Sequence, residues 1–304
     1  MRRAWLAFFA AVLTVSAMAQ PQPQPQTQTQ TQTQTAVIVP SLDASGGKPL
    51  PLKAFWFAAS NATASAPAMV LLHGCGGLYD RQGRLATRYT DMARRLNALG
   101  VHVLATDSLT PRGERGLCTQ RYSARSVSMV QRRRDALGAL QWLAAQPGVD
   151  AQRLGLLGWS NGGSTVLAAL NGKHREVVAA TVRPSLAVAF YPGCGAEVAR
   201  GFAPVAPLLM LLAEADDWTP AAPCKALAQA VAASAAPGVP APEWESYAGA
   251  FHGFDGTDPV RVRTDVPNGV RSGQGVHVGS DPAAREAATL RWATFLQQHW
   301  PVLR

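Results

Sequence analysis

Ser160 lies in a sequence that is typical of an activated serine nucleophile. Residues 158–163 read GWSNGG and fit the pattern G-x-S-x-G, with an apolar run before them and a helical pattern after them. A serine at a sharp turn between strand and helix has strained backbone angles, and glycines beside it leave room for its close neighbours. The helix behind it also directs backbone N–H groups towards developing negative charge. We therefore predict that Ser160 attacks the carbonyl carbon of an acyl group.

A second glycine-rich turn could supply part of an oxyanion hole. Residues 73–77 read HGCGG and follow the apolar run 70–72. A tetrahedral intermediate needs two fixed N–H donors, and the loss of one costs about 3–4 kcal/mol. We assign these donors to the backbone amides of Cys75 and Asn161. The Cys75 thiol itself lacks the strand–turn–helix context of a nucleophile.

A base and an acid follow later in the chain. Asp216 and Asp217 both come directly after the apolar run Leu208–Ala213, and position alone does not separate them. Of the six histidines, His252 follows the last predicted strand. It gives the order Ser, Asp, His that serine hydrolases with a G-x-S-x-G turn have. We predict that His252 is the general base and that one of the two aspartates orients it.

The elements that must position these residues alternate along the chain. Short apolar runs between longer helical patterns indicate an α/β fold with a mostly parallel sheet and helices on both faces. The predicted strands are Leu52–Ala58, Met69–His73, Val101–Thr106, Leu154–Trp159, Leu186–Tyr191, Leu208–Ala213 and Trp244–Tyr247. The predicted helices, besides the one after Ser160, are Thr87–Leu99, Ser126–Gln146, Ala221–Ala235 and Pro282–Trp300.

Two segments between these elements are loops. Asp107–Ala124 is too short for a large lid domain, so a shallow cleft is expected. Asp255–Asp281 is long, has no clear periodicity and is predicted to be an irregular loop, a type that is often functional.

The N-terminal sequence indicates export. Two arginines, the apolar run Ala4–Val15 and the small residues 17–19 predict a signal peptide over residues 1–19. The apolar run is shorter than the roughly 20 residues that a membrane span needs, so no stable membrane insertion is expected. Residues 20–35 alternate Pro-Gln and Thr-Gln, which predicts a disordered linker. One domain over residues 36–304 then remains, in the periplasm or outside the cell.

Composition restricts the partners. The formal net charge is +9, and the densest basic run, Arg132–Arg134, lies in a helical pattern, where we expect a solvated face. No nucleic-acid-binding motif is present, so nucleic acid is not an expected partner. No metal-ligand spacing or phosphate loop is found either, so neither a metal nor a cofactor is expected. Four cysteines in an exported chain predict disulfides, for which three pairings are possible.

Taken together, these motifs resemble the dienelactone hydrolase family of the α/β-hydrolase superfamily, over nearly the whole of Leu52–Trp300. The resemblance rests on the turn 73–77, the turn 158–163, an aspartate four residues before Pro220, and His252-Gly253-Phe254. The spacing to Pro220 selects Asp216. Well-known members use a cysteine nucleophile, whereas this chain has Ser160, so it is similar to a serine-nucleophile variant. The resemblance also implies a single domain without a large lid.

The resemblance further implies a pairing of the cysteines. In the usual strand order of this fold, the strands that end near His73 and Thr106 are neighbours, and so are the strands that end near Tyr191 and Ala213. Two cysteines follow each pair of strands. The expected disulfides are Cys75–Cys118 and Cys194–Cys224.

It also implies substrate-binding residues. Well-known members hold a substrate carboxylate with two arginines; Arg112 falls close to the first, and Asp255 lies near the position of the second. We expect Arg112 to bind a carboxylate and Trp159 and Trp218 to form walls of the pocket. The expected activity is hydrolysis of small carboxylic esters or lactones through an acyl-enzyme. A secreted peptidase, an acyltransferase or a non-catalytic binding protein could have the same fold.

Overall fold

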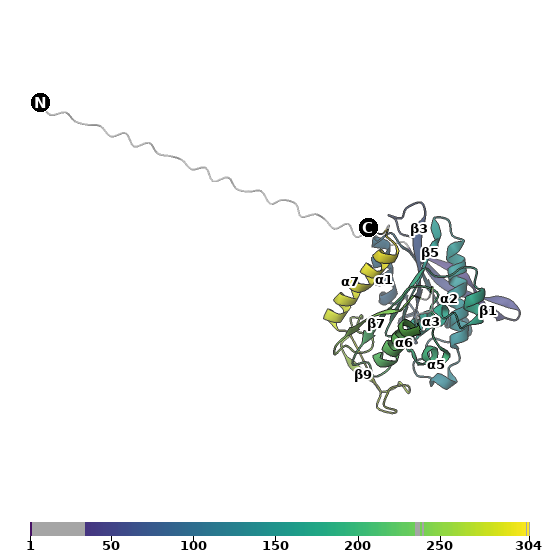
Figure 1. The fold of residues 1–304 in the computed structure, drawn as a ribbon, viewed down its shortest axis with the longest axis vertical. Coiled ribbons are helices and arrows are strands. Elements are labelled where there is room, and N and C mark those ends of the chain that lie inside the picture. The colour runs from purple at the N-terminus through teal and green to yellow at the C-terminus, as the bar shows by residue number, and fades with distance from the viewer. Residues whose placement is uncertain (2–33, 235–237, 239, 302, 304) are drawn as a thin grey trace. The chain divides into compact units, whose positions relative to one another are not determined.

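The computed structural model describes Met1 and residues 34–234, 238, 240–301 and 303. The predicted signal peptide and residues 20–33 of the predicted linker lie outside these residues. In the described part of the chain, eight strands form one sheet in the order β1-β2-β4-β3-β5-β6-β7-β8. Figure 1 labels β1, β3, β5 and β7 of this sheet. Their bounds are β1 Gln34–Ser45, β2 Lys48–Phe57, β3 Ala66–Leu72, β4 His102–Thr106, β5 Val149–Trp159, β6 Leu186–Phe190, β7 Leu208–Ala213 and β8 Glu243–Tyr247.

Strands β1 and β2 run antiparallel to their neighbours, and the other pairs in the sheet are parallel. The predicted mostly parallel sheet is confirmed. Parallel pairing brings the carboxyl ends of β3, β5 and β7 to one edge, and β3 lies directly beside β5. The turns that carry Cys75, Ser160 and Asp216 leave these three strand ends, so the sheet order positions them together.

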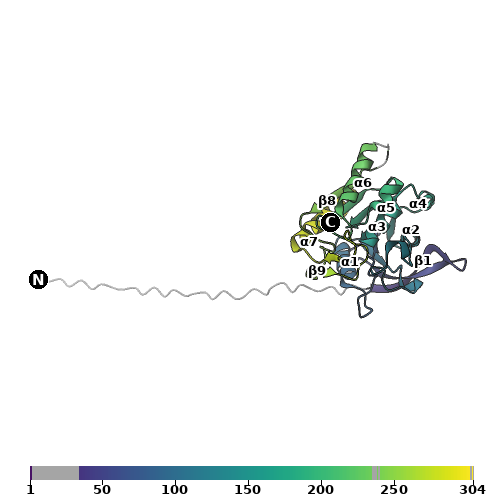
Figure 2. The same cartoon turned by 90° about the horizontal axis from the view of Figure 1, so that it is seen from below.

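Side chains alternate between two apolar layers along the buried strands. In β3, Met69 and Leu71 belong to one hydrophobic cluster, whereas Val70 and Leu72 belong to the other. Helices α1 (Thr87–Ala98) and α7 (Pro282–His299) cover the first layer. Helices α2, α3 and α6 cover the second, so α1 and α7 lie across the sheet from α2 and α3 (Figure 2). The remaining helical bounds are α2 Met129–Ala144, α3 Asn161–Leu170, α4 Arg175–Ala179, α5 Gly195–Arg200 and α6 Ala221–Ser234, with 3₁₀ turns η1 Thr110–Arg112 and η2 Tyr122–Ala124.

Side-chain caps set where two of the helices begin. Ser128 accepts a hydrogen bond from the N–H of Gln131, whose side chain bonds back to the N–H of Ser128, and this capping box starts α2. Asp281 accepts a hydrogen bond from the N–H of Ala284 at the start of α7, with Pro282 in the first helical position.

Two features differ from the sequence prediction. Gln34 and Thr35, expected in the linker, are the first residues of the edge strand β1, which was not predicted, and both side chains are exposed. Within Asp255–Asp281, β9 (Arg261–Arg263) and β10 (Val276–Val278) pair as a short antiparallel hairpin. Three-residue strands are too short to show a periodicity.

Both expected cysteine pairs are disulfides in the structure. Cys75 is joined to Cys118 across 43 residues of sequence, and Cys194 is joined to Cys224 across 30. The first links the turn after β3 to the loop after β4. The second links the start of α5 to α6.

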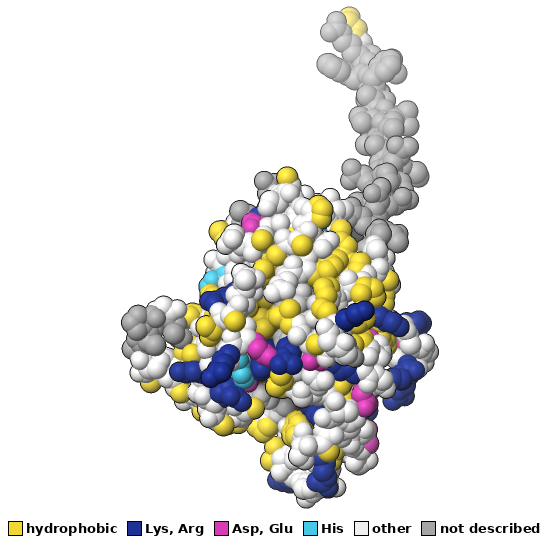
Figure 3. Space-filling view, turned by 90° about the vertical axis from the view of Figure 1, so that its right-hand side faces the viewer, with side chains coloured by type: hydrophobic (Ala, Val, Ile, Leu, Met, Phe, Trp, Pro, Cys, Tyr) yellow, Lys and Arg dark blue, Asp and Glu magenta, His cyan; other side chains and the backbone are white. Residues whose placement is uncertain are grey.

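The basic run on α2 does not form the solvated face that we predicted. Arg132 and Arg133 are buried, and only the Arg134 side chain is substantially exposed. Arg133 and Arg134 both bind Glu176, and Arg134 also binds Asp43, so two carboxylates face these two charges. On the face in Figure 3, Lys and Arg side chains lie in several separate groups. No helix among the described residues is long and apolar enough to span a bilayer.

Candidate active site

Ser160 stands at a strained turn between β5 and α3. Its φ of 54° and ψ of −117° lie outside the ordinary regions for a residue with a side chain. A Cβ on Gly158 would lie 2.3 Å from the carbonyl oxygen of Gly162, and one on Gly162 would lie 2.0 Å from that of Leu72. Non-bonded heavy atoms cannot approach so closely, so both positions need glycine. The local sequence thus permits the turn that presents Ser160.

Hydrogen bonds connect the three residues predicted to act together. The Ser160 Oγ lies 2.9 Å from Nε2 of His252, and Nδ1 of His252 lies 2.8 Å from Oδ2 of Asp216. Oδ1 of Asp216 accepts the N–H groups of Trp218 and Thr219, each at 2.8 Å. The carboxylate therefore faces Nδ1, which favours a proton there and leaves Nε2 free to accept the Ser160 proton.

Asp217 has a different role in the structure. It binds the β9–β10 hairpin: Oδ1 accepts the N–H of His277 at 2.8 Å, and Oδ2 lies 2.7 Å from Nδ1 of the same residue. The backbone oxygen of Asp217 also accepts the N–H of Val270. Asp216 alone of the two aspartates contacts His252, in agreement with the residue that the Pro220 spacing selects.

Aromatic rings hold His252 in place. The centroid of the Tyr191 ring lies 4.5 Å from the centroid of the His252 imidazole, and the centroid of the Trp218 ring lies 4.6 Å from it. Of the described residues other than glycine, Ser160 and Tyr191 have positive φ, and both lie at this site. Strained backbone of this kind clusters at functional sites.

The two turns that carry the backbone amides assigned to the oxyanion hole contact each other. A Cβ on Gly74 would lie 3.4 Å from the Trp159 oxygen and 3.7 Å from the Cβ of Ser160, so the turn after β3 contacts the turn after β5. The N–H groups of Cys75 and Asn161 donate to no acceptor in the part of the chain that the structure describes. They are free to bind an oxyanion.

A pocket of about 440 Å³ opens in front of Ser160 and His252. Trp159 and Trp218, both predicted to be walls, line it. Trp159 is almost fully buried: its ring stacks on Phe190, and its Nε1 donates to Asp255 at 2.8 Å. No group of three or more potential metal-ligating side chains occurs among the described residues.

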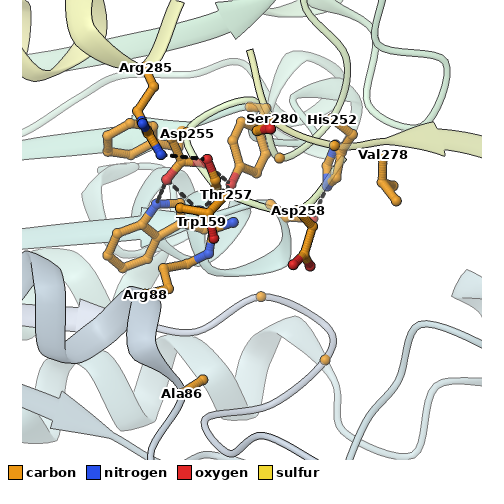
Figure 4. Close-up of a pocket in the computed structure, with 18 of the residues that line it drawn as sticks. Ala86, Arg88, Trp159, His252, Asp255, Thr257, Asp258, Val278, Ser280 and Arg285 are labelled. Carbon is orange, nitrogen blue, oxygen red and sulfur yellow. Dashed lines mark hydrogen bonds and ion pairs between the residues drawn. The ribbon is translucent and has the colours of Figure 1, made fainter. Parts of the chain in front are cut away.

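Asp255 is the centre of a polar cluster in the wall of this pocket (Figure 4). Besides Trp159, it accepts hydrogen bonds from the Arg88 guanidinium and from the hydroxyl of Tyr191, at 2.6 Å in the second case. Burial, the largest cause, and the negative charge of Asp255 raise the pKa of Tyr191 well above its usual value. Further arginines line the same pocket: Arg95, Arg261, Arg263 and Arg285.

The prediction for Arg112 is wrong. Its guanidinium donates to Asp135 at 2.8 and 2.9 Å, to Asp43 at 2.9 Å and to the oxygen of Ser108 at 2.7 Å, and it does not line the pocket. Its side chain is only 9% exposed. Arg112 therefore links the β1–β2 hairpin to α2 and is not available to a substrate carboxylate.

Arg88 and Tyr191 were not predicted to belong to the site, and Asp255 was considered only as a departure from the family pattern. Arg88 stands in an ordinary amphipathic helix and Tyr191 at the end of an apolar strand, so neither carries a local signal. The only available signal was charge: Asp255 lies three residues after His252, and a buried carboxylate there requires donors from elsewhere in the fold.

Comparison with known proteins now assigns the family. A family model described as "Dienelactone hydrolase family" matches residues 52–300. The chain belongs to the dienelactone hydrolase family. The match covers the turn with Cys75, the turn with Ser160, and both Asp216 and His252, and it confirms the resemblance seen in the sequence. Among curated proteins, none matches the chain.

Solved structures of similar fold are hydrolases of this kind. The dienelactone hydrolase-like promiscuous phosphotriesterase P91 from metagenomic libraries has 19% identity and a TM-score of 0.61, over 89% of this chain and 99% of that one. The thermophilic esterase Est2 of the Planctomycetes species Thermogutta terrifontis has 17% identity and a TM-score of 0.58, over 88% and 93%. The same esterase phosphorylated by paraoxon has 18% identity and a TM-score of 0.59, over 88% and 95%. Because these identities are below 20%, the similarity to these structures is a similarity of fold alone.

Proposed function

We propose that this protein is an exported serine hydrolase that cleaves carboxylic esters or lactones through an acyl-enzyme on Ser160. The observation that carries the proposal is the unbroken hydrogen-bonded series from Ser160 through His252 to Asp216, at the wall of a pocket. Membership of a hydrolase family and the similarity in fold to an esterase support the same reaction class.

The geometry suggests how the proton moves. As the Ser160 oxygen attacks the carbonyl carbon, its proton passes to Nε2 of His252, while Asp216 stabilises the imidazolium through Nδ1. The negative oxygen of the tetrahedral intermediate is held by the N–H groups of Cys75 and Asn161. His252 then gives its proton to the leaving alcohol as the ester bond breaks. A water molecule, deprotonated by His252, releases the acid from Ser160.

The pocket favours small substrates. Its volume of about 440 Å³ is near the lower end of the range for small-molecule sites. The Thermogutta terrifontis esterase, which has a similar fold, has been solved with propionate and with butyrate bound. We therefore propose esters of short acyl groups as the substrate class.

The proposed location is the periplasm or the extracellular space. Both disulfides require an oxidising compartment to form and persist. The predicted signal peptide over residues 1–19 points to the same place. Expression with and without those residues, followed by cell fractionation, tests this: export only of the full chain is expected, and a cytoplasmic full-length protein with four free thiols would contradict it.

A substrate panel tests the activity. Acetate, butyrate, octanoate and dodecanoate esters of p-nitrophenol, a lactone and a peptide amide are compared by kcat/KM. The proposal predicts the highest values for the two short esters and a loss of several orders of magnitude in Ser160→Ala. Ser164→Ala is the matched control, because this side chain lies one turn further along α3 and binds only backbone groups. Preference for the amide would favour a peptidase, and inactivity on every substrate would favour a binding protein.

A further inference from the structure

Arg132 is a buried cation behind the two turns that carry the oxyanion-hole amides. It lies in the first part of α2 and is 1% exposed. One terminal nitrogen donates to the side-chain oxygen of Asn161. The other donates to the backbone oxygen of His73 at 2.7 Å. A single guanidinium therefore connects the end of β3 with the first residue of α3.

His73 fixes the orientation of the Cys75 amide. Nε2 of His73 accepts the N–H of Ser108 at 3.2 Å, so the proton of the neutral ring is on Nδ1, which donates to the oxygen of Gly74 at 2.7 Å. Burial, and next the positive charge of Arg132, hold the pKa of His73 well below its usual value and keep the ring neutral. In a trans peptide the C=O and N–H groups point in opposite directions. Holding the Gly74 oxygen thus directs the N–H of Cys75 away from His73.

Arg132 differs from the other buried arginines in its partners. Arg112 and Arg133 bind carboxylates. Arg132 forms no ion pair with a described residue, and its Nε has no hydrogen-bond partner. Although burial lowers the pKa of Arg132 to about 10, the group remains charged at neutral pH. Asp135 and Asp107 attract this charge without forming an ion pair with it, so the guanidinium places a buried positive charge beside the oxyanion hole, where it stabilises negative charge that forms there.

We infer that Arg132 is a positioning residue of the oxyanion hole: through Asn161 and His73 it fixes the two turns whose N–H groups donate hydrogen bonds to the oxyanion. This inference rests on the proposed function. It assigns to Arg132 a role in the transition state and none in binding the ground-state ester, because its guanidinium lies behind the turns and does not line the pocket.

Kinetics of Arg132→Met and Arg132→Lys on p-nitrophenyl butyrate test the inference. A displacement of about 1 Å at a catalytic group costs about 100-fold in rate. We expect kcat to fall by about 10- to 100-fold in Arg132→Met with KM nearly unchanged, and to fall less in Arg132→Lys. Binding of a trifluoromethyl ketone, which places a negative oxygen in the hole, should weaken by the same factor as kcat/KM. Binding of butyramide, a neutral analogue of the ground-state ester, should not change.

The matched control is Arg112→Met, which removes another largely buried arginine that also contacts α2 but touches neither turn. It should lower thermal stability and leave kcat unchanged. If Arg132→Met does not fold, Asn161→Ala decides, since it removes the acceptor of the guanidinium and keeps the backbone N–H. Asn161→Ala should then lower kcat and ketone affinity together. A wild-type kcat in a folded Arg132→Met or Asn161→Ala variant would overturn the inference alone, whereas an inactive wild-type protein would overturn the proposed function and the inference with it.

Discussion

The two disulfides should contribute equally to stability but unequally to catalysis. They close loops of similar length, with sequence separations of 43 and 30 residues. Loop entropy then gives about 4 kcal/mol for each as an upper figure. For a domain of this size, that corresponds to a fall in Tm of roughly 8–16 °C when either is removed. Only Cys75, however, also carries an N–H group of the proposed oxyanion hole.

The surroundings of Cys75 explain why its disulfide should affect the rate. The backbone oxygen of Cys75 accepts the N–H of Leu117 at 2.7 Å, and a Cβ on Gly77 would lie 2.5 Å from the oxygen of Arg115. The loop up to Cys118 is therefore pressed against the turn and holds it in place. Without the disulfide, the Cys75 amide should move, and kcat should fall by about 10-fold, or by about 100- to 1,000-fold if the donor is lost completely.

The assay compares two double variants. Cys75→Ala with Cys118→Ala, and Cys194→Ala with Cys224→Ala, are each measured for Tm by circular dichroism and for kcat on p-nitrophenyl butyrate well below Tm. Both should lose similar stability, and only the first should lose kcat. If both pairs change kcat equally, or if the first leaves kcat unchanged, the disulfide does not hold the oxyanion turn.

Three further predictions concern the acid, the turn at Ser160 and the buried histidines. Asp216→Asn should lower kcat by about ten-thousand-fold, whereas Asp217→Asn, which contacts only the hairpin, should keep most of the activity; similar losses in steady-state assays would reassign the acid. Gly162→Ala should reduce the free energy of unfolding by about 3 kcal/mol or more, because its Cβ would meet the Leu72 oxygen at 2.0 Å. Gly195→Ala, whose Cβ meets open space, should leave the free energy of unfolding unchanged. Urea titration measures both variants, and equal stability of the two would refute the steric reasoning. Burial lowers the pKa of His73, His102 and His174 below the ordinary 6.5. Below pH 6.5 the unfolded chain therefore binds protons that the folded chain does not bind, and Tm should fall as the pH drops. A Tm that stays constant as the pH falls from about 7 to about 5 would contradict this linkage.

Much of the fold could be predicted from the sequence because it depends on local patterns. The buried strands are continuous apolar runs, as β3 and β7 illustrate, and the alternation with helices fixes the class. The position of Ser160 could be read from its glycines, because contact distances at Gly158 and Gly162 permit no other residue. The resemblance to the dienelactone hydrolase family followed from the spacing of such motifs.

The wrong predictions concern contacts between residues that are distant in the sequence. Arg112 was expected to bind substrate and Arg132 to face solvent, yet both are buried by partners that are distant in the sequence: Asp43 for the first and His73 for the second. Ion pairs and hydrogen bonds between distant residues leave no periodic signal in a single sequence. Position alone could not distinguish Asp216 from Asp217 for a similar reason. The β9–β10 hairpin that binds Asp217 is formed from two three-residue strands, which are too short to be predicted.

Labelling with a fluorophosphonate probe tests the central claim most directly, because the probe reacts only with a serine that is activated by a base in a folded site. Purified protein is treated with the probe, digested and mapped by mass spectrometry, with circular dichroism to show that each variant is folded. We predict one adduct, on Ser160 and not on the neighbouring Ser164, and no adduct in folded Ser160→Ala or His252→Ala. A folded wild-type protein that carries no adduct, or an adduct on another residue, would contradict the assignment of Ser160 as the nucleophile.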